Sequence, residues 1–351
     1  MPILGNFLHF RELLLKLKLL HPVLDEYHRL YGPVVGLRFG SKELIIISGK
    51  DAVQEGLARE EFDGRQCGFL IEHRSNGERK GVIFTDGEEW KEQRRFALRN
   101  LRDLGFGKRS MESMIREEAL ELVSRLTEMG KKAGTEGVDM ERVFTIPVLN
   151  SLWSIMTGQR YSQEDEKLKK FTDLLMTVSR LMTSSALLDS YPWLRFFYPW
   201  FKKYDALRTE LRHFFMETVE DHKKTKTDGE PRDFIDTYLD EMKRREGDKS
   251  YFSEVQLLAI CDDLFAAGTE TTSYTLAFGV IFLLHHPDVQ TKMHEELDRE
   301  SAIVFSLRSV HMDANYWGDP HIFRPERFLI PDDKGGMKLK DESSWLISFG
   351  L

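Results

Sequence analysis

The chain has 351 residues, of which 41% are hydrophobic, so it can bury one large core or two ordinary ones. Its formal net charge of −8 argues against nucleic acid as the main partner. The sequence contains no internal repeat and no biased tract, which excludes repeat arrays and long disordered segments. The two cysteines, Cys67 and Cys261, lie far apart, which excludes a disulfide scaffold and favours a reducing compartment.

The first predicted element is a β-hairpin in the region 31–50. Val34 to Phe39 and Glu43 to Ser48 are short runs rich in β-branched residues, and a turn-forming Gly-Ser-Lys sequence separates them. Most of residues 51–300 is expected to be helical. One helix has apolar residues at helical spacing from Met111, and Gly130 is predicted to end it. The predicted fold class is therefore mainly α with a small β-sheet.

A membrane span is not predicted anywhere in the sequence. The longest apolar run, near residues 276–284, is shorter than the roughly 20 residues that a bilayer crossing needs. The N-terminus lacks the apolar stretch of a signal peptide, and it reads as though an anchor segment had preceded Met1.

A long helix is predicted to begin at Ser253. Ser253 followed by Gln256 has the capping-box spacing, and no proline interrupts the pattern before Pro287. A helix of about 32 residues would extend roughly 48 Å at 1.5 Å per residue. This length suggests an element that crosses the middle of the molecule.

The interior of this helix reads Ala266-Ala267-Gly268-Thr269-Glu270-Thr271-Thr272. A glycine in a helix interior costs about 1 kcal/mol relative to alanine, and a threonine hydroxyl can bond to the carbonyl four residues earlier, here that of Ala267 for Thr271. This combination predicts a bend whose small residues let a flat cofactor approach the backbone. A carboxylate at Glu270 beside a hydroxyl would provide a proton route. The alternative is a structural kink with internally packed threonines and Glu270 in solvent.

The segment from Ala267 to Thr272 resembles the A/G-G-x-D/E-T-T signature of the cytochrome P-450 family. The resemblance implies haem b as the cofactor, with Ala267 and Gly268 against the haem and Ala267 also lining the substrate pocket. It assigns proton delivery to Glu270 and Thr271. It further implies a monooxygenase that inserts one atom of dioxygen into a small apolar substrate, with electrons that come from NADPH through a cytochrome reductase.

A second motif, Trp90 and Arg94, is similar to the family's W-x-x-x-R. The spacing places the indole and the guanidinium on one helical face, and the resemblance assigns both to the haem propionates. Taken alone, the pair also fits an aromatic residue on a basic helix. By looser resemblance, Phe84 lines the substrate pocket and Arg65 reaches the haem edge.

Longer stretches extend the resemblance over essentially the whole chain. Residues 90–119 and 231–239 resemble the microsomal family-two branch closely, and residues 323–328 read FRPERF, the family's F-x-P-E-R-F. The resemblance implies one incomplete cytochrome P-450 domain over residues 1–351, with a residual strand and the PERF segment in 301–351. It also implies a location on the cytosolic face of the endoplasmic reticulum membrane.

Two surface segments lead to partner predictions. The stretch from Lys91 to Arg109 holds seven basic and two acidic residues; it is either a solvated helix face or, by resemblance, the docking surface for the reductase. The stretch from Ser190 to Phe201 is rich in aromatic residues, which suits core packing or, by resemblance, contact with the membrane interface.

A segment of the family pattern is missing after Glu300. It would contain the E-x-x-R helix. The match to E-x-x-R at Glu296 to Arg299 lies too close to the motif at Ala267 to Thr272 and is interpreted as coincidental. Arg327 would normally pair with that helix. We therefore expect a buried Arg327 without compensation, at a cost of about 3–5 kcal/mol.

The cysteine that would bind the haem iron is also missing. The sequence ends at Leu351 with the start of the family's F-G-x-G-x-R-x-C loop, and neither Cys67 nor Cys261 is placed to replace the ligand. No metal ligand is therefore assigned within this chain, which is expected to be inactive as it stands. The alternative function is a catalytically dead fragment that at most binds the reductase.

Overall fold

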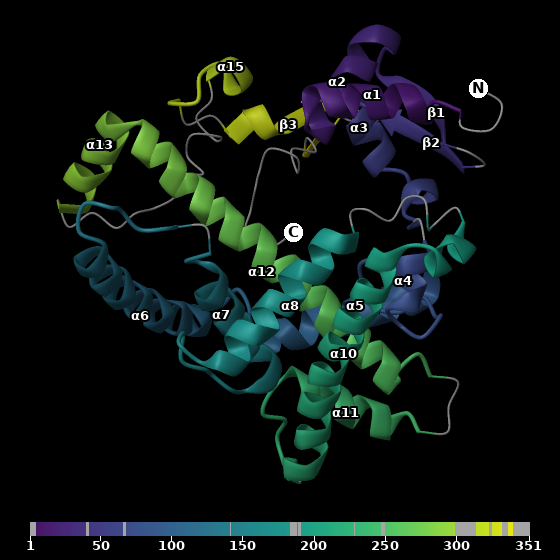
Figure 1. The fold of residues 1–351 in the computed structure, drawn as a ribbon. Coiled ribbons are helices and arrows are strands. Elements are labelled where there is room, and N and C mark those ends of the chain that lie inside the picture. Colours follow the sequence, from purple (N-terminus) through teal and green to yellow (C-terminus); the bar gives the residue numbers. More distant parts are fainter. Residues whose placement is uncertain are drawn as a thin grey trace. The chain divides into compact units, whose positions relative to one another are not determined.

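The computed structural model describes residues 5–39, 42–65, 68–140, 142–182, 188, 191–227, 229–246, 250–298, 314–322, 325–331 and 336–339. The chain forms two compact units, Met1–Ala277 and Phe278–Leu351. The described part is mainly helical with two small antiparallel sheets, which confirms the predicted fold class (Figure 1). None of the described helices combines the length and the apolar composition that crossing a bilayer requires.

The first unit begins with a small helix-and-hairpin region. Its elements are α1 (Phe7–Leu17), α2 (Leu20–Tyr31), β1 (Val34–Phe39), β2 (Lys42–Ile47) and α3 (Lys50–Leu57). The two strands pair in antiparallel register from Val34 opposite Ile47 to Phe39 opposite Lys42, so the predicted hairpin is confirmed. Val35 and Leu37, alternate residues of β1, pack with Tyr27 of α2 because alternate side chains of a strand share a face.

The rest of the first unit is helical. Its elements are η1 (Glu60–Phe62), α4 (Phe69–His73), α5 (Gly87–Asp103), α6 (Arg109–Ala133), α7 (Thr145–Thr157), α8 (Glu166–Met182), η2 (Pro192–Phe196), α10 (Pro199–Thr225), α11 (Phe234–Arg244) and α12 (Glu254–His285). The core lies where α7, α8, α10 and α12 meet. There the Trp153 ring centroid lies 5.2 Å from that of Phe171 and 4.9 Å from that of Phe265, within the range of favourable aromatic pairs.

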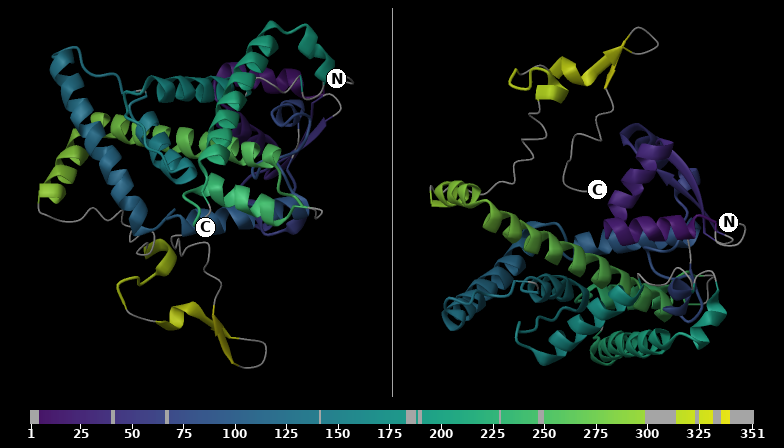
Figure 2. Two further views of the ribbon diagram at one scale, coloured as in Figure 1. Left: turned by 90° about the horizontal axis from the view of Figure 1, so that it is seen from below. Right: turned by 45° about the horizontal axis from the view of Figure 1, so that its top comes forward.

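The predicted long helix is α12, and its predicted start is confirmed. The Gln256 N–H donates to Ser253 Oγ at 3.2 Å, as an N-cap requires. The Gln256 side chain does not return to Ser253, however. It exchanges two hydrogen bonds with the backbone of Gly81, at 2.9 and 3.1 Å. Figure 2 shows from two further sides how the first part of α12 runs among the helices of its unit.

The prediction that Gly130 ends a helix is wrong. Gly130 lies inside α6, which continues to Ala133, and Gly134 follows it with φ +55°. Gly134 therefore marks the end, because glycine adopts a positive φ without steric cost. Gly130 is tolerated within the helix because nothing packs against its missing Cβ.

The second unit contains the remainder of α12, α13 (Pro287–Asp298), α15 (Ala314–Trp317), η3 (Pro325–Phe328), β3 (Leu329–Pro331) and β4 (Met337–Leu339). β3 and β4 pair in antiparallel register, with Ile330 opposite Lys338. The PERF residues form the short 3-10 helix η3. The strand predicted after Glu300 lies outside the described residues.

Gly268 lies where α12 packs against α7. A Cβ added at this position would come within 3.1 Å of Leu152 Cδ2, whereas nothing lies within 4 Å of a Cβ added at Gly279 on the same helix. Both glycines are in a helix interior, where alanine is favoured intrinsically. Alanine substitutions at Gly268 and Gly279 therefore distinguish the effect of helix propensity on stability from the effect of packing.

We predict that Gly279→Ala raises the free energy of unfolding by about 1 kcal/mol. Gly268→Ala should lose that gain to overpacking against Leu152, which typically costs about 1–3 kcal/mol. Urea unfolding followed by circular dichroism measures both variants. Equal stabilisation of the two would contradict the close approach of α7 at Gly268.

Candidate functional site

One face of α12 beyond Phe265 is open, and it carries part of the motif from Ala267 to Thr272. Ala267, Thr271 and Thr275, spaced by four residues, are exposed along this face. The Thr271 hydroxyl donates to the Ala267 carbonyl at 2.7 Å, as predicted from the sequence, and Thr275 donates to the Thr271 carbonyl at 2.8 Å. The open face therefore offers a small side chain at 267 next to a hydroxyl at 271.

Gly268, Thr269 and Glu270 of the motif point elsewhere. Gly268 faces Leu152, so the close approach that this glycine permits in the structure is to α7. Thr269 is fully buried, and its hydroxyl is without a hydrogen-bond partner in the part of the chain that the structure describes. Glu270 accepts a hydrogen bond from Ser179 of α8 at 2.7 Å. The predicted cofactor contacts of Ala267 and Gly268 thus fall on different faces of α12.

Trp90 and Arg94 share one face of α5, as their spacing predicts. The Arg94 guanidinium lies 5.4 Å from the centre of the Trp90 ring. The indole N–H of Trp90 donates to the Val82 carbonyl at 3.0 Å. Because an indole has a single donor, Trp90 has none left for a propionate, and the free donors of the motif belong to Arg94.

A basic hollow of about 660 Å³ lies along α5. It is lined by Trp90, Lys91, Arg94, Arg95, Leu98, Arg99, Arg102 and Asp103. Lys91 is paired with Glu88 at 2.9 Å, but Arg95, Arg99 and Arg102 form no ion pair within the described ranges. The hollow therefore presents uncompensated guanidinium groups around an exposed leucine.

A buried polar cluster joins α12 to the segment before α5, and sequence reasoning missed it. The Asp263 carboxylate accepts from Arg74 and from the backbone N–H groups of Val82 and Ile83, the last two at 2.6 and 3.0 Å. Asp262 accepts two hydrogen bonds from Arg208 of α10 and a third from Arg74. Two adjacent aspartates inside an otherwise apolar helix were the signal that could have found the cluster.

Burial and charge pairing have opposite effects on the pKa values of the two aspartates in this cluster. Burial acts to raise the pKa of Asp262, but Arg208 and Arg74 outweigh it and hold the pKa of this carboxyl below its ordinary value. Burial raises the pKa of Asp263 despite the nearby Arg74. The charged form of Asp263 is supported by the three donors that converge on it.

Phe84 and Arg65 have local partners. The Arg74 guanidinium lies 5.1 Å from the centre of the Phe84 ring, which places Phe84 next to the polar cluster of α12. Arg65 is exposed, and it donates to the carbonyls of Asp63 and Gly64 at 3.0 and 3.3 Å. Their predicted roles toward substrate and haem remain predictions.

The expectation that Arg327 lacks compensation is wrong. Arg327 donates to the carbonyls of Trp317, Asp319 and Ile322, at 3.4, 2.8 and 2.7 Å. Its guanidinium also lies 3.1 Å from an Asp319 carboxylate oxygen. The residues just before η3 therefore satisfy this arginine within its own unit.

Cys261 does not offer a thiolate. It is 1% exposed and packs in the core of the first unit. Burial, together with the nearby carboxylates of Asp262 and Asp233, raises the pKa of this thiol far above its ordinary value. Cys67, Arg299 and the C-terminal Ser-Phe-Gly-Leu lie outside the described residues.

The aromatic segment from Ser190 to Phe201 divides into two parts. Trp193, Phe196 and Phe197 are exposed, whereas Phe201 is buried in the core. Ser190 lies outside the described residues. Core packing therefore explains the end of the segment and leaves its beginning as an apolar surface.

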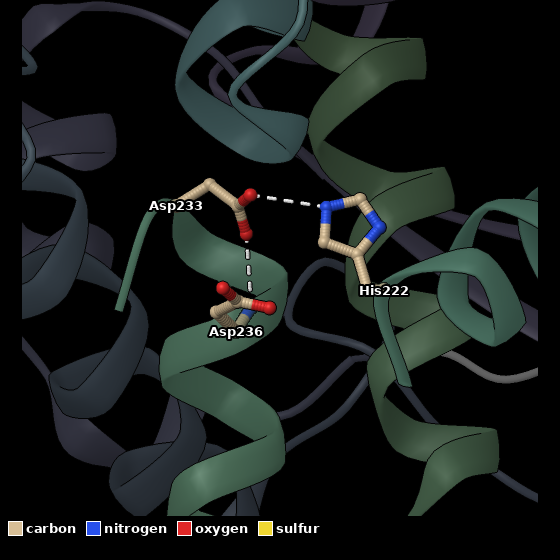
Figure 3. Close-up of side chains that lie close together, drawn as sticks. All are labelled: His222, Asp233 and Asp236. Carbon is tan, nitrogen blue, oxygen red and sulfur yellow. Dashed lines mark hydrogen bonds and ion pairs between the residues drawn. The ribbon is translucent and has the colours of Figure 1, made fainter. Parts of the chain in front are cut away.

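His222, Asp233 and Asp236 lie close together with the donor atoms of a possible metal site, as Figure 3 shows. Both ring nitrogens of His222 contact acceptors: Nδ1 the Thr218 carbonyl at 2.7 Å, and Nε2 an Asp233 carboxylate oxygen at 3.0 Å. The other Asp233 oxygen caps α11 by accepting the Asp236 N–H. Arg232 holds the Asp236 carboxylate with two hydrogen bonds.

These contacts define an ion-pair network rather than a metal site. A metal ligand must be a neutral imidazole with a free lone pair, but both His222 nitrogens are placed to donate. Burial acts to lower the pKa of His222, but the hydrogen bonds to Asp233 and to the Thr218 carbonyl outweigh it and raise the pKa. His222 thus connects α10 to the start of α11 through acceptors at both of its ring nitrogens, an arrangement that favours its charged form.

Comparisons with known proteins show which family the chain resembles. The Cytochrome P450 family profile matches residues 1–302. The chain is 31% identical over 409 residues to farnesoate epoxidase of Bombyx mori, covering 100% of this chain and 80% of the relative. It is 32% identical over 420 residues to probable cytochrome P450 305a1 of Drosophila melanogaster, covering 100% and 81%. Cytochrome P450 2C23 of Rattus norvegicus is 35% identical over 305 residues, covering 85% and 60%.

The chain belongs to the cytochrome P450 family, a family of haem-dependent monooxygenases. The alignment with farnesoate epoxidase spans 409 residues although this chain has 351, so that relative contains segments that this chain lacks. The family match ends at residue 302, next to Glu300. The end of the family match at this point is consistent with the predicted omission of a segment after Glu300.

We predict that His222 makes stability depend on pH. A group whose pKa is raised by folding contributes fully below its unfolded value of about 6.5, and that contribution is lost as the pH rises through the folded value. Urea unfolding between about pH 5.5 and 8.5 should show this decline in the wild type. His222→Gln should be less stable at low pH and should lose this part of the pH dependence.

His213→Gln is the matched control, because His213 is an exposed histidine on the same helix. It should follow the wild-type profile. The neighbouring charges of Asp233, Asp236 and Arg232 are unchanged in both variants. A His222→Gln profile parallel to the wild-type profile would show that His222 is not charged in the fold.

Proposed function

We propose that this chain acts as a haem-dependent monooxygenase on a small apolar substrate at the endoplasmic reticulum, with electrons that come from NADPH through a cytochrome reductase. The observation that carries the proposal is the open face of α12, where Ala267 and the Thr271 hydroxyl lie one turn apart. A relative named farnesoate epoxidase and the rat cytochrome P450 2C23 support an apolar substrate and a microsomal location.

The residues present fit part of a haem site. Arg94 has donors for a propionate in the hollow along α5, and the small side chain of Ala267 leaves room for a flat apolar ring. Bound haem would supply the activation of dioxygen. Cys261 does not fit the role of the iron ligand, because it is buried and protonated.

Proton delivery is assigned to Glu270 and Thr271. The Thr271 hydroxyl donates its proton to the Ala267 carbonyl, which leaves its oxygen free to accept on the open face. Glu270 is adjacent in sequence and partly buried, and its carboxylate is oriented by Ser179. A carboxylate in this position can take up a proton from solvent and release it toward the hydroxyl.

The uncompensated arginines of α5 support a docking surface for an acidic reductase. Arg95, Arg99 and Arg102 surround the exposed Leu98, a basic surface with an apolar centre. Such a surface raises the rate of encounter with a partner of opposite charge. The exposed rings of Trp193, Phe196 and Phe197 support contact with the membrane interface, where aromatic residues are favoured.

The difference spectrum of the reduced, haem-loaded chain with carbon monoxide tests the proposal. A thiolate-type Soret band supports a monooxygenase. Haem binding without this band, with reductase binding retained, would indicate instead a catalytically inactive chain that serves only as a binding partner of the reductase.

We predict that Arg94→Ala lowers the affinity for haem about ten-fold, because a hydrogen bond to a charged group is lost. Arg95→Ala removes the same charge one residue further on and should leave haem affinity unchanged while it weakens reductase binding. Haem titration and surface plasmon resonance with the reductase measure the two effects. Equal losses of haem affinity in both variants would argue against a specific propionate contact at Arg94.

A further inference from the structure

The partner of Glu270 is unusual among the helical hydroxyls of this chain. Thr172, Thr271 and Ser273 each donate to the carbonyl four residues earlier in their own helix, which is the default for such side chains. The Ser179 hydroxyl instead donates to Glu270 Oε2 at 2.7 Å, from α8 to α12. This distance is typical of a hydrogen bond from a hydroxyl to a carboxylate.

Both ends of this contact are held by the core. On α8, Leu175 and Val178 are buried, and their packing fixes the rotation of the helix. Val178 directly precedes Ser179, and Leu175 lies one turn before it. On α12, Thr269 is fully buried on one side of Glu270, while Thr271 is exposed on the other. Packing therefore fixes the two backbone positions from which Ser179 and Glu270 meet.

Ser179 is the sole hydrogen-bond partner of the Glu270 carboxylate within the described part of the chain, and no ion pair there involves Glu270. A lysine or arginine at this point would hold the carboxylate as a permanent ion pair. A hydroxyl orients the carboxylate and still lets it gain and lose a proton, because it can donate or accept. This property suits a group that transfers protons.

We propose that Ser179 is a positioning residue, which holds the Glu270 carboxylate at the edge of the open face of α12 so that it can exchange a proton with the Thr271 side of the helix. The proposal rests on the proposed monooxygenase function. It adds to that function a requirement that α8 lie in contact with α12 during turnover.

The first test reads the contact itself and does not depend on activity. Infrared spectra of the full chain, with the Glu270 carboxylate band located by subtraction of Glu270→Gln, should show that Ser179→Ala shifts this band. Ser179→Thr, which keeps a hydroxyl, should restore it. Thr177→Ala, which removes a hydroxyl from the same helix two residues earlier, should leave it in place. An unshifted band in Ser179→Ala would overturn the proposal.

The second test reads the consequence in the haem-loaded chain with reductase. The share of NADPH electrons recovered in oxygenated product should fall on the order of five-fold in Ser179→Ala, as expected for one lost hydrogen bond, with a matching rise in hydrogen peroxide. Ser179→Thr and Thr177→Ala should stay close to the wild type.

A shifted infrared band with unchanged product yield would overturn the positioning role and leave the monooxygenase assignment intact. A wild type that consumes no NADPH would refute the proposed function, and the infrared result would still decide the contact.

Discussion

The carboxylate of Asp263 receives three donors inside the core, from Arg74 and from the backbone of Val82 and Ile83. A carboxylate buried without such partners would strongly destabilise the fold. The segment around residue 82 must therefore keep its backbone N–H groups on Asp263 for this part of α12 to remain buried. Gly81 shows how close the fit is, because a Cβ there would come within 2.2 Å of Asp263 Oδ2. The same segment fixes α5, because the Val82 carbonyl accepts the Trp90 indole N–H. The buried carboxylate of Asp263 thus fixes the position of α5 relative to α12.

This constraint explains why the two halves of α12 differ. The first half carries the paired aspartates and is buried almost throughout, whereas beyond Phe265 one face opens and presents Ala267 and Thr271. Glu270 lies between the buried and open faces and turns toward Ser179 of α8. Glu270 and Thr271, which we propose for proton delivery, are therefore supported differently in this chain, one by a neighbouring helix and the other by its own backbone.

The sequence predicts the periodic features of this fold well. The hairpin, the start of α12 at Ser253 and the bond from Thr271 to the Ala267 carbonyl all follow from short-range patterns.

Contacts between distant segments could not be predicted in this way. The helix ending was misplaced at Gly130 because only the backbone reveals that Gly134 has a positive φ. Arg327 donates hydrogen bonds to nearby backbone carbonyls, and a search for oppositely charged side chains does not reveal such partners. The role of Gly268 beside Leu152 likewise depends on a helix more than 100 residues away in sequence.

Amide hydrogen exchange at Val82 and Ile83 tests the central claim most directly. Asparagine in place of Asp263 has the same shape but only one acceptor oxygen and no charge for the three donors. In Asp263→Asn the two amides should exchange at least about ten-fold faster than in the wild type, because opening of this segment becomes easier. Asp205→Asn, at a half-exposed acid paired with His73, should leave them unchanged. Wild-type protection of Val82 and Ile83 in Asp263→Asn would show that the buried carboxylate does not hold this segment to α12.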